Sequence, residues 1–279
     1  MVQPARHRVT VGVALSIAGA LLFSGSSHAA QPNSSVALPV DGQSGDPLAT
    51  PEVPGDLLNL DKWKITLPQN EAGIDGDPDE IVLDAGSKYQ HPGFFRLSAD
   101  GQRVLFRAPV EGLATEHSEF PRSELREMTS SDDPRSEGIG WSTTSGTHVM
   151  TLRTRITEVP KVKQHVVVAQ IHDEVDDVAM VRWEFGRLFV EANGAEVGDL
   201  NINQPLNEDF DIEMRAADGV ISISYNGGPP VVLNRSLTGC YFKAGVYTQS
   251  NMTRIWDGVL EDPTSAGAVE MTSLTVTHS

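Results

Sequence analysis

The chain has 279 residues, of which 39% are hydrophobic and 21% charged, so its composition indicates a globular protein and excludes one that is disordered overall. The formal net charge of −17 argues against nucleic acid and anionic membranes as partners. The single cysteine, Cys240, excludes an intrachain disulfide, and its surroundings indicate a small buried residue without an activating motif. Stability must therefore come from a substantial hydrophobic core.

The first 29 residues have the pattern of a secretion signal peptide. Arg6 and Arg8 form a basic start, residues 9–23 are largely small and apolar, and residues 27–29 fit a small-x-small cleavage site. The apolar stretch is short and interrupted by Gly and Ser, which is untypical of a membrane span, although an uncleaved anchor is the alternative. We therefore expect a secreted, extracellular protein with no membrane association after cleavage.

Residues 30–55 are rich in Pro, Ser, Gly and Asp and poor in large apolar side chains. This composition is typical of a linker or a disordered segment without a core of its own. The domain is predicted to begin at Asp56 and to continue to residue 279.

Strand-like runs separated by turn signals follow along the domain, and no long stretch has the 3.6-residue period of an amphipathic helix. Asp218-Gly219 and Asn226-Gly227 are hairpin signals. The pattern predicts an all-β fold, a β-jelly roll sandwich of two antiparallel sheets whose concave face would form a substrate groove. The predicted strands are Arg103–Ala108, His148–Ile156, His165–His172, Val181–Val190, Asp211–Arg215, Val220–Tyr225, Lys243–Gln249 and Glu270–His278.

Three predicted strands, in PRSELRE (121–127), AQIHDE (169–174) and YFKAGVYTQ (241–249), each carry one polar face. If they are neighbours, the faces form a patch that can neutralise a carboxylate and transfer protons. The alternatives are an exposed salt-bridge ladder, a hydrogen-bonded core histidine and a tyrosine that only packs. The candidate residues are Arg122, Glu124, Arg126, Gln170, His172, Lys243, Tyr247 and Gln249.

Two local features of these strands have more than one interpretation. Strict alternation would place Val166 and Val168 on the same face as Gln170 and His172. Gly245 would either let a ligand approach the backbone or mark a β-bulge.

In their order and spacing, RSELR, QIH and YFKAGVY closely resemble the signature blocks of the alginate lyases of polysaccharide lyase family 7. The resemblance extends from DKWKITLP, near Asp56, to the final strand-like EMTSLTVTHS. It implies a jelly roll that binds alginate, a polymer of mannuronate and guluronate, and cleaves it by β-elimination without a cofactor. A basic site on an acidic protein can still hold this polyanion, because salt screens charges beyond ~8–10 Å.

The resemblance also implies residue roles. Arg122 and Gln170 would neutralise the uronate carboxylate, and His172 would be the general base. Tyr247 would protonate the leaving oxygen and, where the geometry is syn, would serve as base as well. Arg126, Lys243 and Gln249 would bind sugars or shape the site, and Glu124, grouped with them as a substrate-binding residue, would orient the arginines. Ile171 is associated with activity on guluronate-containing blocks in that family. We expect an endo-acting monomer with no catalytic metal, and a structural Ca²⁺ is left open.

Two other functions are compatible with such a fold. Glu208, Asp209, Asp211 and Glu213 alternate as a glycoside hydrolase's carboxylate pair would, although a solvated strand edge explains them equally. A non-catalytic module that binds acidic glycans would favour aromatic platforms, but only 6% of this chain is aromatic.

Overall fold

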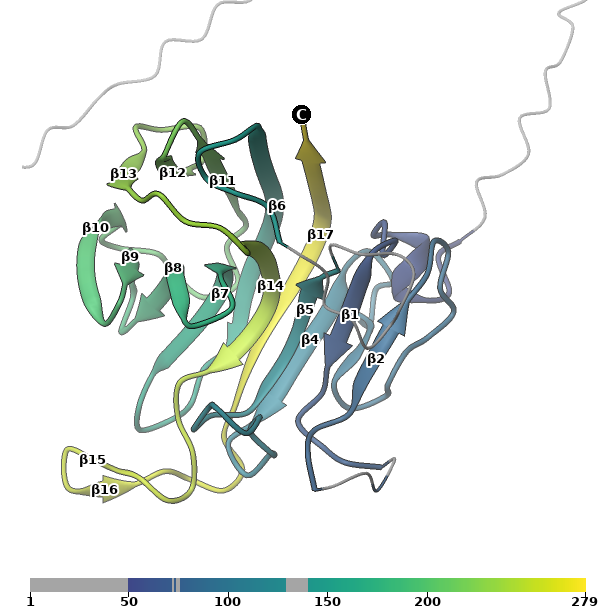
Figure 1. Cartoon of the computed structure of the whole chain (residues 1–279). Coiled ribbons are helices and arrows are strands. Elements are labelled where there is room, and N and C mark those ends of the chain that lie inside the picture. The colour runs from purple at the N-terminus through teal and green to yellow at the C-terminus, as the bar shows by residue number, and fades with distance from the viewer. Residues whose placement is uncertain (1–49, 72, 74–75, 129–139) are drawn as a thin grey trace, which may run out of the picture. The chain divides into compact units, whose positions relative to one another are not determined.

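The computed structural model describes residues 50–71, 73, 76–128 and 140–279, and most of the strands are labelled in Figure 1. The predicted signal peptide and most of the predicted linker lie outside these residues. Within residues 50–55, Val53 and Pro54 are buried and a 3₁₀ turn, η1, spans Pro54–Asp56. Packing thus begins a few residues before Asp56.

The larger sheet has eight antiparallel strands in the order β10-β9-β8-β7-β14-β5-β1-β2. Its centre consists of β7, β14 and β5, the strands that carry the three polar faces noted in the sequence. The bounds are β1 Trp63–Thr66, β2 Glu80–Leu83, β5 Arg122–Glu127, β7 His165–His172, β8 Asp177–Glu184, β9 Arg187–Ala192, β10 Ala195–Asn201 and β14 Tyr241–Thr248.

The second sheet has seven antiparallel strands in the order β13-β12-β11-β6-β17-β4-β3. A short hairpin of β15 (Ile255–Trp256) and β16 (Val259–Leu260) follows β14. The bounds in the second sheet are β3 Phe95–Leu97, β4 Val104–Pro109, β6 Thr147–Glu158, β11 Phe210–Ala217, β12 Val220–Tyr225, β13 Val231–Asn234 and β17 Ala266–His278. The two antiparallel sheets confirm the all-β sandwich predicted from the strand pattern.

The core lies between the two large sheets, where β14 packs against β4 and β17. Phe106 from β4 and Val246 from β14 are both fully buried in it. At Gly267 on β17 the sheets approach so closely that a Cβ atom would lie 2.9 Å from Val166 Cγ1 and 3.0 Å from Val246 Cγ2. Burial of this apolar surface supplies the main driving force for folding.

Tight turns follow the hairpin signals. Asp218-Gly219 joins β11 to β12 as a two-residue hairpin turn, and both residues have the positive φ that such a turn requires. Asn226-Gly227 also have positive φ, but they begin a five-residue loop, 226–230, that joins β12 to β13. The predicted strand Val181–Val190 is wrong as a single element. The chain turns at Phe185-Gly186, with φ of 47° and 94°, and forms β8 and β9. Phe185 carries no turn signal, and the single Gly186 beside it was the one local indication of the break.

Candidate active site

The three polar strands are neighbours, and their register determines which side chains meet. On β14, Lys243 lies opposite Arg126 of β5 and opposite Gln170 of β7. Tyr247 lies opposite Arg122, and Tyr241 lies opposite His172. The intervening residues, among them Leu125, Ala244 and Ile171, belong to the core. We call the opposite face of these three strands the site face.

Glu124 is the centre of the site face and is fully buried. Its Oε2 accepts a hydrogen bond from Arg122 Nη1 at 3.0 Å and lies 2.7 Å from Lys243 Nζ. Its Oε1 accepts from Gln170 Nε2 at 2.5 Å. Burial alone would raise the pKa of Glu124, but the charges of Lys243 and Arg122 and these hydrogen bonds lower it below its ordinary value. Glu124 is thus a buried anion that holds three donors in place.

The site face retains an excess of positive charge around Glu124. Lys243 is 7% exposed, and burial, with the nearby charge of Arg122, lowers its pKa to about 8. The Nε of Arg122 is buried and has no hydrogen-bond partner among the described residues. Arg122 and Lys243 therefore place two cationic groups beside the single carboxylate of Glu124.

Tyr247 is held by Arg122 and by Ser118, which precedes β5. The guanidinium carbon of Arg122 lies 4.0 Å from the centre of the Tyr247 ring. Ser118 Oγ lies 2.8 Å from the Tyr247 hydroxyl and accepts a hydrogen bond from Arg122 Nη2 at 2.9 Å. Ser118 is a site residue that the sequence did not suggest, because it lies outside the strand that carries the polar face.

His172 is held at the opposite end of the site face from Tyr247. Its Nδ1 lies 2.6 Å from the main-chain oxygen of Asp173 and 3.0 Å from the Tyr241 hydroxyl. The imidazole stacks on the Tyr241 ring, with 5.3 Å between centroids. Burial lowers the pKa of His172 below its ordinary value, and the charge of Lys243 adds to this effect. The imidazole of His172 is therefore neutral at neutral pH.

Arg126 and Gln249 flank the catalytic candidates. The guanidinium carbon of Arg126 lies 3.8 Å from the centre of the Tyr241 ring. Gln249 follows β14 and is 6% exposed, and its main-chain N–H donates to the His165 carbonyl at 3.2 Å. The structure thus brings Arg122, Glu124, Arg126, Gln170, His172, Lys243 and Tyr247 together on the three neighbouring strands, and Gln249 follows directly after one of them.

Two bulges change the faces that strict alternation predicted. The pairing of β7 with β8 shifts between Val167 and Ala169, and that of β14 with β7 shifts between Ala244 and Tyr247. Val166 and Val168 consequently lie in the core together with Ala169, so their predicted place beside Gln170 is wrong.

Gly245 is a bulge glycine and does not open the backbone to a ligand. It has a φ of 142°, and a Cβ atom there would lie 2.5 Å from the carbonyl oxygen of Ser123. The space beside it is filled by β5. Cys240 is fully buried where its backbone bridges to Trp141, and burial raises the pKa of its thiol to about 12, which excludes a ready nucleophile.

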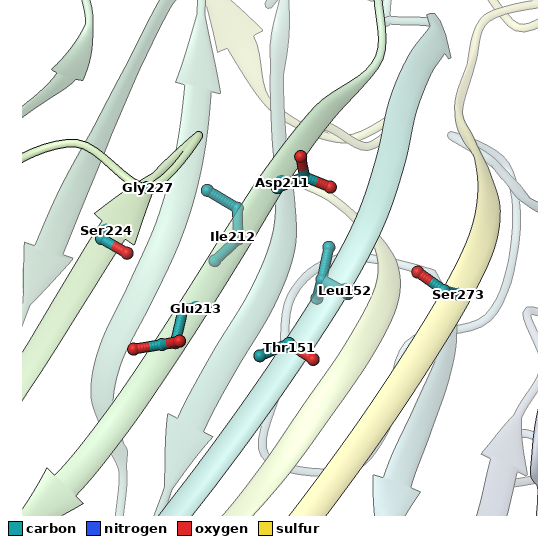
Figure 2. A pocket seen from close by; sticks show the side chains of 8 residues that line it. All are labelled: Thr151, Leu152, Asp211, Ile212, Glu213, Ser224, Gly227 and Ser273. Atoms are coloured by element: carbon teal, nitrogen blue, oxygen red, sulfur yellow. The ribbon is translucent and has the colours of Figure 1, made fainter.

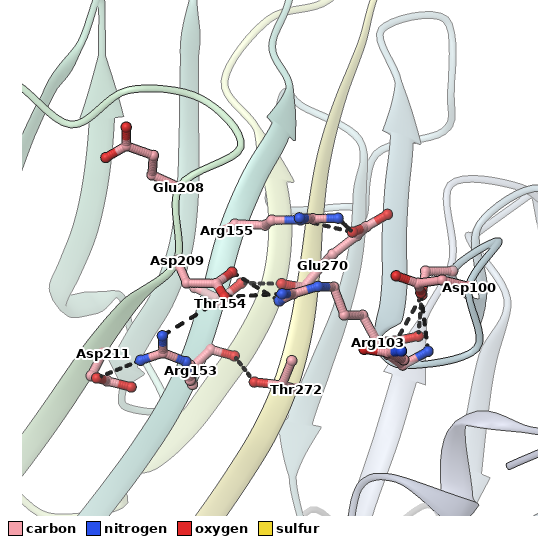
Figure 3. Close-up of polar contacts among 12 residues, drawn as sticks. Asp100, Arg103, Arg153, Thr154, Arg155, Glu208, Asp209, Asp211, Glu270 and Thr272 are labelled. Carbon is pink, nitrogen blue, oxygen red and sulfur yellow. Dashed lines mark hydrogen bonds and ion pairs between the residues drawn. The ribbon is translucent and has the colours of Figure 1, made fainter. Parts of the chain in front are cut away.

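The carboxylates of the hydrolase alternative lie at the other sheet, on β11 or just before it. A shallow pocket beside Asp211 and Glu213 is shown in Figure 2. Figure 3 shows Asp211 and Asp209 in ion pairs: Arg153 Nη1 lies 2.8 Å from Asp211 Oδ2, and Arg103 Nη1 lies 2.8 Å from Asp209 Oδ1. These pairs leave two of the carboxylates bound to arginines. β11 pairs with β12 on one side and with β6 on the other, so it is not an edge strand.

The described residues also limit other kinds of site. Among them, no group of three or more His, Cys, Asp or Glu side chains is placed to hold a metal ion. In the same part of the chain, no helix has the length and apolar character needed to cross a membrane.

Comparisons with known proteins agree with this geometry. The family model described as "Alginate lyase" matches residues 58–278. The solved structure of the alginate lyase AlgAT5 from polysaccharide lyase family 7 is 44% identical, covers 81% of this chain and 99% of its own, and has a TM-score of 0.73. The alginate lyase from Corynebacterium sp. is 36% identical, with coverages of 83% and 100% and a TM-score of 0.74. An alginate lyase from Klebsiella pneumoniae is 38% identical over 84 residues, which are 29% of this chain and only 26% of that relative.

Proposed function

Because the chain belongs to the alginate lyase family, we propose that it cleaves the 1,4-glycosidic bonds of alginate by β-elimination and releases unsaturated uronate oligosaccharides. A variant of the alginate lyase A1-II′, 26% identical over 82% of this chain, was solved in complex with a product. That likeness supports a uronate polymer as the ligand of the site face.

The observation that carries the proposal is the buried cluster around Glu124. Arg122, Lys243 and Gln170 all converge on this carboxylate. Two cations share one anion, so the cluster can accept a further negative group without an uncompensated buried charge. A uronate carboxylate beside the Arg122 and Lys243 side chains would supply that group. Neutralisation of the carboxylate makes the C5 proton of the sugar more acidic and stabilises the enolate-like state that follows.

His172 and Tyr247 flank this cluster and supply the two proton transfers. The C5 proton moves to Nε2 of His172, and the electron pair of the C5–H bond forms the C4–C5 double bond. The C4–O4 bond breaks with its electrons on O4, and the Tyr247 hydroxyl donates a proton to this oxygen. No water is consumed and no group is oxidised, so the step needs only this chain's side chains.

Finer features of the activity follow as part of the same proposal. We expect internal cleavage of the polymer by a secreted monomer, with a preference for guluronate-containing blocks and no cofactor. Ile171 is fully buried in the core, so any effect it has on block preference must act through the position of the neighbouring Gln170 and His172.

The test is to incubate the purified mature chain with mannuronate-rich and guluronate-rich alginate and to follow ultraviolet absorbance and product sizes. A lyase creates an absorbing double bond with each cleavage, whereas a hydrolase or a binding module creates none. We expect His172→Ala and Tyr247→Phe to lower the rate by at least about a hundredfold. Tyr89→Phe, which alters a ring stacked on Phe95 at 6.4 Å, is the control. No absorbance rise on either polymer would overturn the proposal.

A further inference from the structure

We infer that Tyr241 is a positioning residue for the general base: its hydroxyl and the Asp173 carbonyl together hold the proton of His172 on Nδ1 and leave Nε2 free to accept the substrate proton. The inference rests on the proposed function and adds a residue to which neither the sequence nor the family resemblance gave a role.

The tautomer of His172 follows from its contacts. Nδ1 lies 2.6 Å from the main-chain oxygen of Asp173, an atom that can only accept a hydrogen bond. Nδ1 must therefore carry a proton in the neutral ring, because two lone pairs at this distance would repel. The Tyr241 oxygen, 3.0 Å from the same nitrogen, is then a second acceptor for this proton. The lone pair of the neutral ring is consequently on Nε2, the nitrogen that a base needs free.

Tyr241 is itself fixed in a way that suits this role. Its ring stacks on the His172 imidazole at an interplanar angle of 20°. The guanidinium carbon of Arg126 lies 3.8 Å from the centre of the Tyr241 ring. The imidazole therefore has one ring beside it and two acceptors at one nitrogen, which restrict its rotation. A base held in the reactive orientation avoids the entropic cost of finding it during each turnover.

Other charged groups around His172 also affect its pKa, and one of them titrates in a similar pH range. Lys243 and Arg122 disfavour the imidazolium and Glu124 favours it. From β8, Asp177 lies opposite His172, and burial with the nearby Asp176 raises the pKa of Asp177 to about 7. Because Asp177 titrates close to the range of His172, the test needs a signal specific to the imidazole.

The experiment uses Tyr241→Phe, which keeps the ring and removes the hydroxyl. Long-range ¹⁵N–¹H spectra of the substrate-free protein report the tautomer and pKa of each histidine, and the His172 signal is identified by its loss in His172→Asn. We expect the parent to show the Nδ1–H form. Loss of one acceptor should lower the pKa of His172 in Tyr241→Phe by about half a unit, because a hydrogen bond from Nδ1–H stabilises the charged ring more than the neutral one.

Kinetics supply the second readout. The acid limb of kcat/KM reports the base in the free enzyme, so in Tyr241→Phe it should move to lower pH by the same amount. We expect kcat to fall about five- to tenfold with little change in KM. Tyr89→Phe should change neither quantity. An unchanged His172 pKa and acid limb, or an Nε2–H tautomer in the parent, would overturn the inference, whereas failure of the parent to cleave alginate would instead overturn the proposed function.

Discussion

Glu124 is the residue on which the site face depends, although it has no direct part in the proposed chemistry. Its two oxygens accept from Arg122 and Gln170 and pair with Lys243, and it is fully buried. Removing one partner from a buried charged group leaves the others without compensation, which costs more than the pair contributes. We therefore expect Glu124 to control both the stability of the centre of the sheet and the net charge of the site face.

Glu124→Gln should test this dependence, because it keeps the size of the side chain and removes the charge. We expect the free energy of unfolding to fall by about 3 kcal/mol and the rate of alginate cleavage to fall at least about a hundredfold. Urea unfolding and initial rates measure the two effects. Asp211→Asn, at an exposed ion pair with Arg153, is the matched control and should cost at most about 1 kcal/mol. A stability loss as small as that of the control would contradict a central role for Glu124.

Sequence reasoning found the site residues that alternate on strands and missed those held by tertiary contacts. Arg122, Gln170 and Lys243 stand out because charged or amide groups recur with period two among apolar residues. Ser118 lies in a loop and Tyr241 at the start of a strand, and neither differs locally from an ordinary turn or packing residue. Their roles come from the register of β14 with β5 and β7, which no local pattern specifies.

At the scale of elements, bulges decide which side chains reach the site face. Strand pairing was predictable from the apolar and polar alternation, but one additional residue in a strand reverses the faces beyond it. This explains why Val166 and Val168 lie in the core while Gln170, on the same strand, faces Glu124. The bulge on β14 depends on Gly245, whose φ of 142° is rare for any residue with a side chain.

Gly245→Ala should therefore destabilise the centre of the sheet. The new Cβ would lie 2.5 Å from the Ser123 carbonyl oxygen and 2.8 Å from Glu124 Cα, so β5 must move or β14 must change its conformation. We expect a loss of about 2–4 kcal/mol in urea unfolding. Gly194→Ala is the control, because Gly194 also has positive φ but nothing lies within 4 Å of the added Cβ, and it should cost about 1 kcal/mol. Equal losses in the two variants would show that backbone strain alone, without the contact to β5, determines the effect.

At the scale of the whole molecule, buried ionisable groups make stability depend on pH. Burial lowers the pKa of both His165 and His172 below 6.5, so the folded state binds fewer protons than the unfolded state in that range. Stability contributed by these histidines is therefore lost as pH falls below about 6.5. The pKa of Glu124 is also lowered, so the stability that Glu124 contributes is likewise lost on acidification, but only below its ordinary pKa of 4.5.

Asp177 affects the pH dependence of stability in the opposite direction. It is therefore the most informative position at which to test how stability depends on pH. Burial and Asp176 raise its pKa from 3.8 to about 7, so above this pH the folded state holds a carboxylate in an unfavourable place. Acidification from pH 8 to 5 relieves that cost in the parent. Asp177→Asn removes the ionisable group and should be more stable than the parent at pH 8 by on the order of 1–2 kcal/mol after discounting for solvent screening. The advantage should largely disappear at pH 5, where Asp177 of the parent is protonated.

Urea unfolding at the two pH values measures this difference, with the exposed Asp84→Asn as a control that should show no pH-dependent gain. Asp177 and His172 lie opposite one another on adjacent strands, so protonation of either group could cause a fall in activity at low pH, the acid limb of the pH profile. Asp177→Asn distinguishes the two causes. If His172 is the base, the acid limb must persist in Asp177→Asn. If the limb instead disappears with the aspartate, the titration that controls activity belongs to Asp177, and the assignment of His172 as the base is wrong.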